Sequence, residues 1–114
     1  MKICIISYLN TSPAWIFYKD IFEKIKLKVD IYENTISEKR LTEYQYIIIF
    51  GVSKNIQRLK EINPRAKFGV LEPRAAQKRN FSEYDFIIAN SLEAKKYFEK
   101  YYLPIFIMPT MPIF

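Results

Sequence analysis

The chain has 114 residues, of which 50% are apolar and 17% aromatic, and it carries a net charge of +6. This length and composition indicate one folded domain with a sizeable core, and they exclude an intrinsically disordered chain. The sequence contains one cysteine and no histidine, which excludes an intrachain disulfide and argues against a zinc site. The longest apolar stretches are far shorter than a membrane-spanning helix, and the first residues lack the cleavage site of a signal peptide, so we expect a cytoplasmic protein.

The first third of the chain predicts a strand, a helix and a second strand. Residues 2–7 are apolar and rich in β-branched side chains, which is typical of a buried strand. Ser12 can cap a helix that has Pro13 at its first position, and apolar residues recur at three- and four-residue spacing over residues 13–25. Residues 27–32 alternate between apolar and polar, which predicts a half-exposed strand near the edge of a sheet.

The middle third contains the strongest strand signal. The stretch YQYIIIFGV, residues 44–52, predicts a central strand buried on both faces, and the polar residues 33–43 before it predict at most a short turn of helix. A short helix over residues 53–62 ends before Pro64, and residues 67–71 predict a fourth strand. A polar, basic connection, residues 72–83, follows.

The last third reads YDFIIANSLEAKKYFEKYYLPIFIMP. It predicts a fifth strand over residues 86–89, a helix over residues 90–102 and a sixth strand, also buried, over residues 104–108. Asn90 followed by Glu93 fits a capping box at the start of the helix. Its expected buried stripe is Leu92, Tyr97, Phe98 and Tyr101.

Strands and helices alternate along the whole chain. This order predicts an α/β fold, a Rossmann-like doubly wound, mostly parallel sheet of about six strands with flanking helices. In such sheets ligands bind beyond the carboxyl ends of the strands. The polar residues predicted there, which caps and turns would also use, are Ser7, Asn10, Thr11 and Ser12 after the first strand, Gly51 and Ser53 after the third, Glu72 and Arg74 after the fourth, and Asn90 and Ser91 after the fifth.

Glu72 and Arg74 are the most informative charged pair. The carboxylate of Glu72 could act as a general base toward an acceptor hydroxyl, and the guanidinium of Arg74 could bind a phosphate. The alternative is an exposed ion pair in a loop. With only two glycines in the chain, no glycine-rich loop opens the first helix, so neither a dinucleotide fingerprint nor a P-loop is present.

The positive charge is concentrated in residues 54–79, which carry eight basic and two acidic side chains. Arg74, Lys78 and Arg79 with Phe81 form a basic, partly apolar loop suited to an anionic membrane surface or a phosphorylated ligand. Solvated helix faces are also often rich in lysine, which is the simpler interpretation. No nucleic-acid-binding motif is present, so nucleic acid is not an expected partner.

Two stretches resemble a known family. YDFIIANSLEAKKYFEKYYLPIFIMPTMP is similar to the end of the N-terminal domain of GT-B-fold glycosyltransferases, and NPRAKFGVLEPR resembles the preceding strand and its acceptor-side loop. The resemblance covers essentially the whole chain. It implies that the chain helps to transfer a sugar from a nucleotide sugar to a glycan or lipid-linked acceptor without a metal. Ser91, Glu72 and the loop after Ser7 would then face the acceptor cleft.

The departures from that family shape the remaining expectations. The glycine-rich loop after the first strand and the acceptor-side histidine of many relatives are missing, and so is the donor-binding domain. We therefore expect residues 1–109 to be the acceptor-side domain and residues 110–114 the start of a linker or a truncated tail. The nucleotide sugar would bind a missing C-terminal domain or a partner subunit, so this chain holds no cofactor and is inactive alone. We expect the chain in the cytoplasm, and at the inner face of the membrane if the basic segment docks there. The alternative is a stand-alone Rossmann-like binding or regulatory module.

Overall fold

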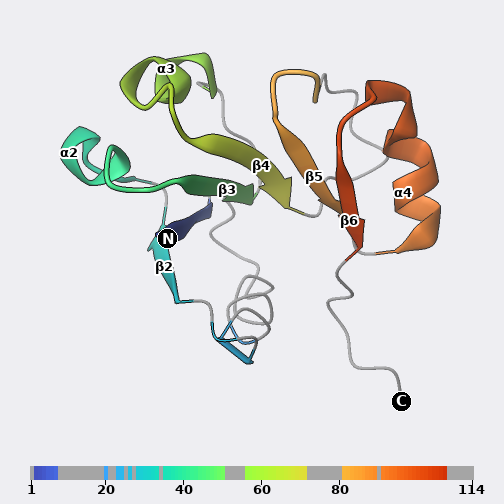
Figure 1. Cartoon of the computed structure of the whole chain (residues 1–114), viewed down its shortest axis with the longest axis horizontal. Coiled ribbons are helices and arrows are strands. Elements are labelled where there is room, and N and C mark those ends of the chain that lie inside the picture. Colours follow the sequence, from blue (N-terminus) through green and yellow to red (C-terminus); the bar gives the residue numbers. More distant parts are fainter. Residues whose placement is uncertain are drawn as a thin grey trace.

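The computed structural model describes residues 2–7, 20, 23–24, 26, 28–33, 35–50, 56–71, 81–89 and 91–107. These residues build one sheet of six strands in the order β2-β1-β3-β4-β5-β6, with every neighbouring pair parallel (Figure 1). The Rossmann-like α/β sheet predicted from the sequence is thus confirmed. Its strands are β1 (Ile3–Ser7), β2 (Val29–Glu33), β3 (Tyr46–Phe50), β4 (Lys67–Leu71), β5 (Phe86–Ala89) and β6 (Ile105–Ile107).

Side chains that alternate along the strands form two hydrophobic clusters, one on each face of the sheet. Cys4 and Ile6 of β1 belong to the first cluster, whereas Ile3 and Ile5 belong to the second. All five residues of β1 are buried, as are the last four of β3 and of β4. The continuous apolar runs in the sequence therefore mark strands that are covered on both faces, as parallel sheets require.

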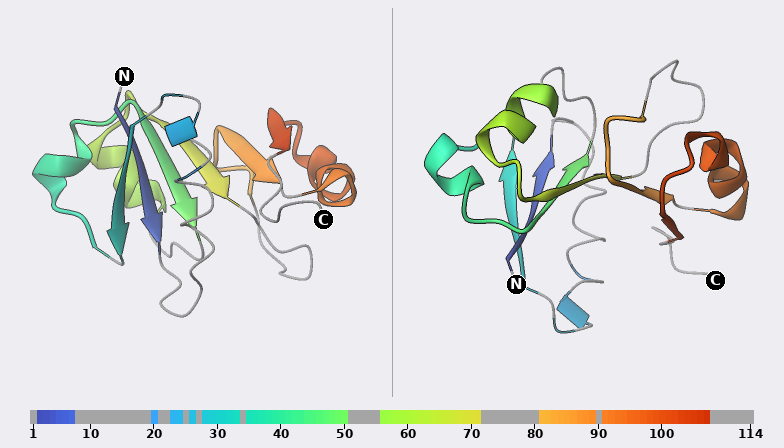
Figure 2. Two further views of the ribbon diagram at one scale, coloured as in Figure 1. Left: turned by 90° about the horizontal axis from the view of Figure 1, so that it is seen from below. Right: turned by 45° about the horizontal axis from the view of Figure 1, so that its top comes forward.

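Three helices contribute to the first cluster, which places them on the same face of the sheet. They are α2 (Glu38–Leu41), α3 (Ile56–Ile62) and α4 (Leu92–Phe98), and a 3₁₀ turn over Glu99–Tyr101 continues α4. Leu41, Ile56 and Phe98 are their buried residues. The helices α2 and α3 lie at the β2 end of the molecule and α4 lies beside β5 and β6 at the other end (Figure 2).

The helix predicted over residues 13–25 falls largely outside the described residues, as do Ser12 and Pro13. The described residues Asp20, Glu23 and Lys24 are helical. Lys26 then adopts a positive φ of 64°, and its N–H donates to the carbonyl of Glu23 at 2.9 Å. This left-handed residue turns the chain toward β2.

The start of α4 differs from the predicted one. Ser91, not Asn90, is the N-cap: its backbone is extended, and its Oγ accepts a hydrogen bond from the N–H of Ala94 at 3.1 Å. With the helix beginning at Leu92, Glu93 is one residue too early for the predicted capping box, although it still lies in the first turn, where the helix dipole favours a negative charge.

The buried stripe of α4 is also narrower than predicted. Phe98 is fully buried, and Ala94 and Tyr101 pack against the same cluster, but Leu92 and Tyr97 are 65% and 40% exposed. The reason is geometric. Ala94 and Tyr101 are four and three residues away from Phe98 and therefore share its helix face, whereas Leu92 and Tyr97 do not. The prediction that Leu92 and Tyr97 are buried is therefore wrong.

Strand β6 is a further correction, because it is an exposed edge strand and not a buried one. Phe106 is 57% exposed and Ile107 is 40% exposed, while only Ile105 packs against the core. The apolar run predicted a strand correctly, but composition alone does not distinguish the last strand of a sheet from a central one.

Candidate functional site

The strand order identifies where a ligand crevice belongs in this fold. From β1 the chain continues to β2 on one side of it, and β3 lies on the other side. The connection that leaves β1 and the connection that leaves β3 therefore run in opposite directions across the sheet. Ligands of open α/β sheets bind at such a switch point, beyond the carboxyl ends of the strands. Ser7 and Phe50 are the last residues of these two strands, and they are paired in register.

Two of the predicted site residues lie within the described part of the chain. Ser7 ends β1 and is 2% exposed, and Ser91 follows β5 and is exposed. Both lie at the carboxyl edge of the sheet, but β3 and β4 separate their strands. With neighbouring strands about 4.8 Å apart, their strands are separated by roughly 14 Å. The remaining predicted residues lie outside the described residues: Asn10, Thr11, Ser12, Gly51, Ser53, Glu72, Arg74 and Asn90.

Ser91 has a local structural role at this edge. Its hydroxyl oxygen is occupied by the N–H of Ala94, and its carbonyl accepts from the N–H of Lys95 at 3.0 Å. The hydroxyl can still donate its proton outward, because capping uses only an oxygen lone pair. Ser91 can thus combine the cap with one hydrogen bond to a ligand.

A polar cluster beside the β2 edge was not predicted from the sequence. Tyr44 is 3% exposed, and its hydroxyl donates to Oδ2 of Asp30 at 2.6 Å and lies 2.8 Å from the hydroxyl of Tyr32. Burial, followed by the hydrogen bond to Asp30, raises the pKa of Tyr44. The alternation of β2 was the available signal, because it places Asp30 and Tyr32 on one face of the sheet.

This cluster lies at the opposite end of the strands from the carboxyl edge, where ligands of such sheets bind. Tyr44 precedes β3 and Asp30 is the second residue of β2, so both lie toward the amino ends of the strands. Cys4 is the register partner of Asp30, and burial followed by the charge of Asp30 raises its pKa to about 12. The thiol is therefore protonated and unreactive at neutral pH.

Two of the four described cations in the basic segment, Arg58 and Lys60, are engaged within the protein. Arg58 pairs with Glu38 at 3.0 Å and with Glu61 at 3.4 Å, and Lys60 donates to the carbonyl of Glu83. Lys54, Arg74, Lys78 and Arg79 lie outside the described residues.

Phe81 does not provide the apolar part of a membrane-docking loop. It is 1% exposed, and its ring lies 5.4 Å from that of Phe98 and 5.6 Å from that of Tyr101. Its burial beside α4 corrects that part of the prediction, because an aromatic ring in the core is not available to a bilayer.

Within the described ranges, no group of three or more acidic, cysteine or histidine side chains is placed to hold a metal ion, and no helix is long and apolar enough to cross a membrane. No protein-family model, curated protein or solved structure matches this chain. Functional assignment therefore rests on the residues and on the geometry of the carboxyl edge.

Proposed function

We propose that the chain is the acceptor-binding half of a glycosyltransferase, which moves a sugar from a nucleotide sugar to a glycan or lipid-linked acceptor. One observation carries this proposal. The segment that resembles the end of a GT-B N-terminal domain corresponds to one β5–α4–β6 unit, with Ser91 at the carboxyl edge of the sheet. The acceptor would bind along that edge, from the crevice between β1 and β3 toward Ser91.

The chemistry assigned to this edge needs one base and one anchor. Glu72 takes the proton of the acceptor hydroxyl as its oxygen forms a bond to the anomeric carbon of the sugar. The bond from that carbon to the nucleotide phosphate breaks, and the nucleotide leaves with its electron pair. Arg74 holds a phosphate of a lipid-linked acceptor, and a second domain or subunit holds the donor.

Acceptor binding can be tested on the chain as it is. Octyl glycosides of glucose, galactose and N-acetylglucosamine, titrated into ¹⁵N-labelled protein, are expected to shift the amide signals of Ser7 and Ser91, whereas a nucleotide sugar leaves them unchanged. Glu72→Gln and Arg74→Gln weaken the shifts. Glu61→Gln is the matched control, because Glu61 pairs with Arg58 on α3, away from this edge. A nucleotide sugar that bound at this edge, or glycosides that caused no shift at millimolar concentration, would contradict the proposal.

A second candidate is a Rossmann-like binding module without catalysis. It is favoured by the two described site residues, since Ser7 is buried and the Ser91 oxygen is used as a cap, and neither is an acid or base poised for proton transfer. Glycoside binding that Glu72→Gln leaves unchanged would select this alternative.

A further inference from the structure

We propose that single-stranded nucleic acid binds the sheet face opposite the described helices, with unpaired bases stacked on Tyr46, Phe86 and Phe106 and with its phosphates beside exposed cations. Tyr46 and Phe86 are the first residues of β3 and β5, so this surface lies away from the carboxyl edge, and the inference does not depend on the proposed function. The three rings come from three separate strands, which explains why the sequence shows no nucleic-acid motif.

The three rings form an aromatic row that crosses the sheet from β3 to β6. The rings of Tyr46 and Phe86 lie 6.4 Å apart, and those of Phe86 and Phe106 lie 6.0 Å apart, both edge to face. Gly69 of β4 makes room for the row, because a Cβ at that position would lie 2.2 Å from the Phe86 ring. The Phe86 ring therefore lies against the backbone of β4, which fixes the middle of the row.

The aromatic row is exposed on the face that the described helices leave open. Phe86 packs against the second hydrophobic cluster, and Phe106 is in register with Ile88 of that cluster, whereas α2, α3 and α4 contribute to the first. Tyr46 is 36% exposed and Phe106 is 57% exposed. Aromatic rings presented in this way can stack on any base, because every base has a π-face.

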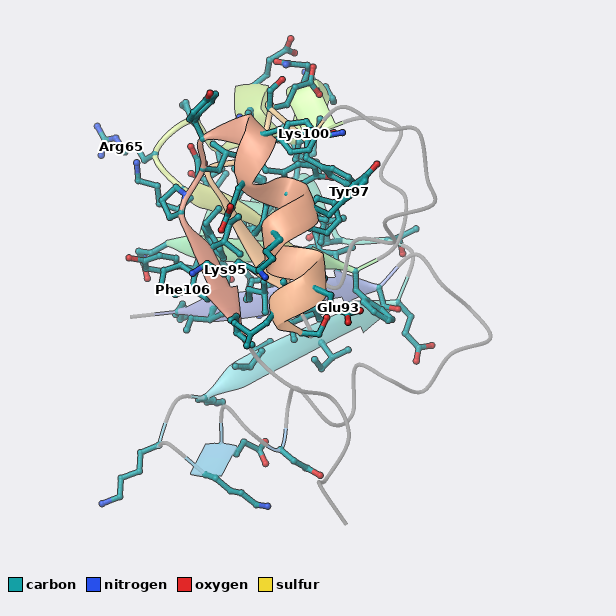
Figure 3. All side chains as sticks on the ribbon, turned by 90° about the vertical axis from the view of Figure 1, so that its right-hand side faces the viewer. Arg65, Glu93, Lys95, Tyr97, Lys100 and Phe106 are labelled. Carbon is teal, nitrogen blue, oxygen red and sulfur yellow. The ribbon has the colours of Figure 1, made fainter. Side chains whose placement is uncertain are left out.

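Cations border the aromatic row. Lys67 is exposed and is the register partner of Tyr46, so the two side chains share a face on neighbouring strands. Among the described strand residues of this face from β3 to β6, Lys67 is the only charged one. Arg65 is exposed as well, and Figure 3 shows Arg65 and Lys95 on the same side of the molecule as Phe106. This positive border is complementary to a phosphate backbone.

Acidic side chains near the sheet are directed elsewhere. Asp85 lies at the amino end of β5, where its Oδ2 accepts a hydrogen bond from the N–H of Phe68 at 2.8 Å. Glu33 is at the carboxyl end of the far edge strand, β2. Glu93 shares the helix face of Tyr97, on the other side of α4 (Figure 3). An anionic ligand on the aromatic row therefore meets cations rather than these carboxylates.

The spacing of the rings favours a single strand over a duplex. Successive bases of a duplex strand are about 3.4 Å apart along the helix axis and are paired in its interior. The ring centroids here are 6.4 and 6.0 Å apart, so a strand with splayed bases can place one base on each ring. A neutral glycan would use the rings without the cations, and a polyphosphate would use the cations without the rings. Single-stranded nucleic acid uses both.

Fluorescence anisotropy with labelled oligouridylate and oligothymidylate, each about eight nucleotides long, tests the proposal on the chain as it is. Both single strands are expected to bind, and a double-stranded hairpin should bind at least about tenfold more weakly because its bases are not free to stack. Phe106→Ala should raise the dissociation constant for the single strands at least about fivefold, since one base loses its ring. Tyr97→Ala is the matched control, because it removes an exposed ring on the other side of α4, and it should leave the constant unchanged.

The salt dependence of binding measures the phosphate contacts. Lys67→Gln should weaken binding and reduce the slope of log Kd against log salt by about 0.7, the value for one phosphate of a single strand, between about 50 and 200 mM salt. Lys39→Gln makes the same change of charge on α2, at the other face of the sheet, and should leave the slope unaltered.

Photochemical cross-linking locates the site on the wild-type chain, so the result does not depend on how any variant folds. An oligonucleotide that contains 5-iodouridine couples on irradiation to an aromatic ring stacked on that base. Mass spectrometry is expected to find the adduct on Tyr46, Phe86 or Phe106.

Three results would overturn the proposal. One is a wild-type chain that binds neither single strand at about 50 mM salt. Another is equal affinity for the single strands, the hairpin and inorganic polyphosphate, which would show attraction by charge alone. The third is a bound strand that lies elsewhere, shown by cross-links confined to other residues or by an equal loss of affinity in Phe106→Ala and Tyr97→Ala.

Discussion

The two halves of the sheet are held together by different interactions. Around β2, β1 and β3, buried polar groups join the elements: Tyr44 bonds to Asp30, and Nδ2 of Asn63 donates to the carbonyls of Leu41 and Tyr44 at 2.8 and 2.9 Å. Around β5, β6 and α4, aromatic rings join them, with Phe81 and Phe98 edge to face at 5.4 Å.

The two halves use different interactions because they join different elements to the sheet. Near β2, the short helix α2 ends with free carbonyls, and Asn63 at the end of α3 satisfies one of them while also fixing the start of β3. Near β6, Phe81 lies five residues before the start of β5, and its ring packs against that of Phe98 on α4. Hydrogen bonds fix positions in one half, whereas ring packing supplies the buried area in the other.

The largest effect is expected when the aromatic half loses its central ring. Phe98→Ala removes a fully buried side chain that contacts the rings of Phe81, Tyr97 and Tyr101, and it should lower the free energy of unfolding by about 3–5 kcal/mol. Urea denaturation measures this change. Tyr97→Ala, at a 40% exposed neighbour, should cost less than about 1 kcal/mol. Equal costs would mean that burial on α4 does not determine its contribution.

The stability of the polar half should fall strongly when Asn63 loses its side-chain donor. Asn63→Asp replaces an amide that donates to two buried carbonyls with a carboxylate that only accepts, and we expect a loss of about 3 kcal/mol at pH 7. Facing two carbonyls, the introduced carboxyl has a raised pKa, so the loss relative to wild type should shrink as the pH falls and the group becomes a donor. A loss that did not change between pH 7 and pH 4 would contradict the assigned hydrogen bonds.

An intermediate effect is expected from alkaline pH, again in the polar half. The pKa of Cys4 rises from 9.0 to about 12 on folding, so the folded chain binds this proton more tightly than the unfolded chain. The resulting stability is complete below pH 9 and is lost as the pH rises toward 12, with a loss on the order of 2 kcal/mol at pH 10.5. Denaturation of wild type and Cys4→Ala at pH 8 and pH 10.5 isolates this loss. If both proteins lost the same stability, the buried thiol would not be its source.

The smallest effect concerns the cap of α4. Ser91→Ala removes the acceptor for the N–H of Ala94 and should cost about 1 kcal/mol, whereas Ser91→Asn, which keeps an oxygen there, should retain most of the stability. Thermal unfolding measures both variants. A loss of glycoside binding in Ser91→Asn without a loss of stability would separate the proposed ligand contact from the cap.

The strands were predictable because burial on both faces leaves a clear signal. Residues 67–71 and 86–89 were predicted with the observed bounds, and residues 44–52 contain the central strand β3. The edge position of β2 was also predictable, since its alternation showed one exposed face. That Ser7 and Ser91 lie at the same edge of the sheet was predictable, because parallel strands bring their carboxyl ends together.

The sequence by itself determined the parallel α/β sheet, because strand and helix periods alternate along the chain and because parallel connections have a fixed hand. The tertiary structure alone decided which apolar side chains are buried. Phe81 lies in the core and Leu92 in solvent, and Phe106 is at an open edge, although all three are large and apolar. The physical reason is that burial depends on which elements pack against each face, and that partnership is set by contacts far apart in the sequence.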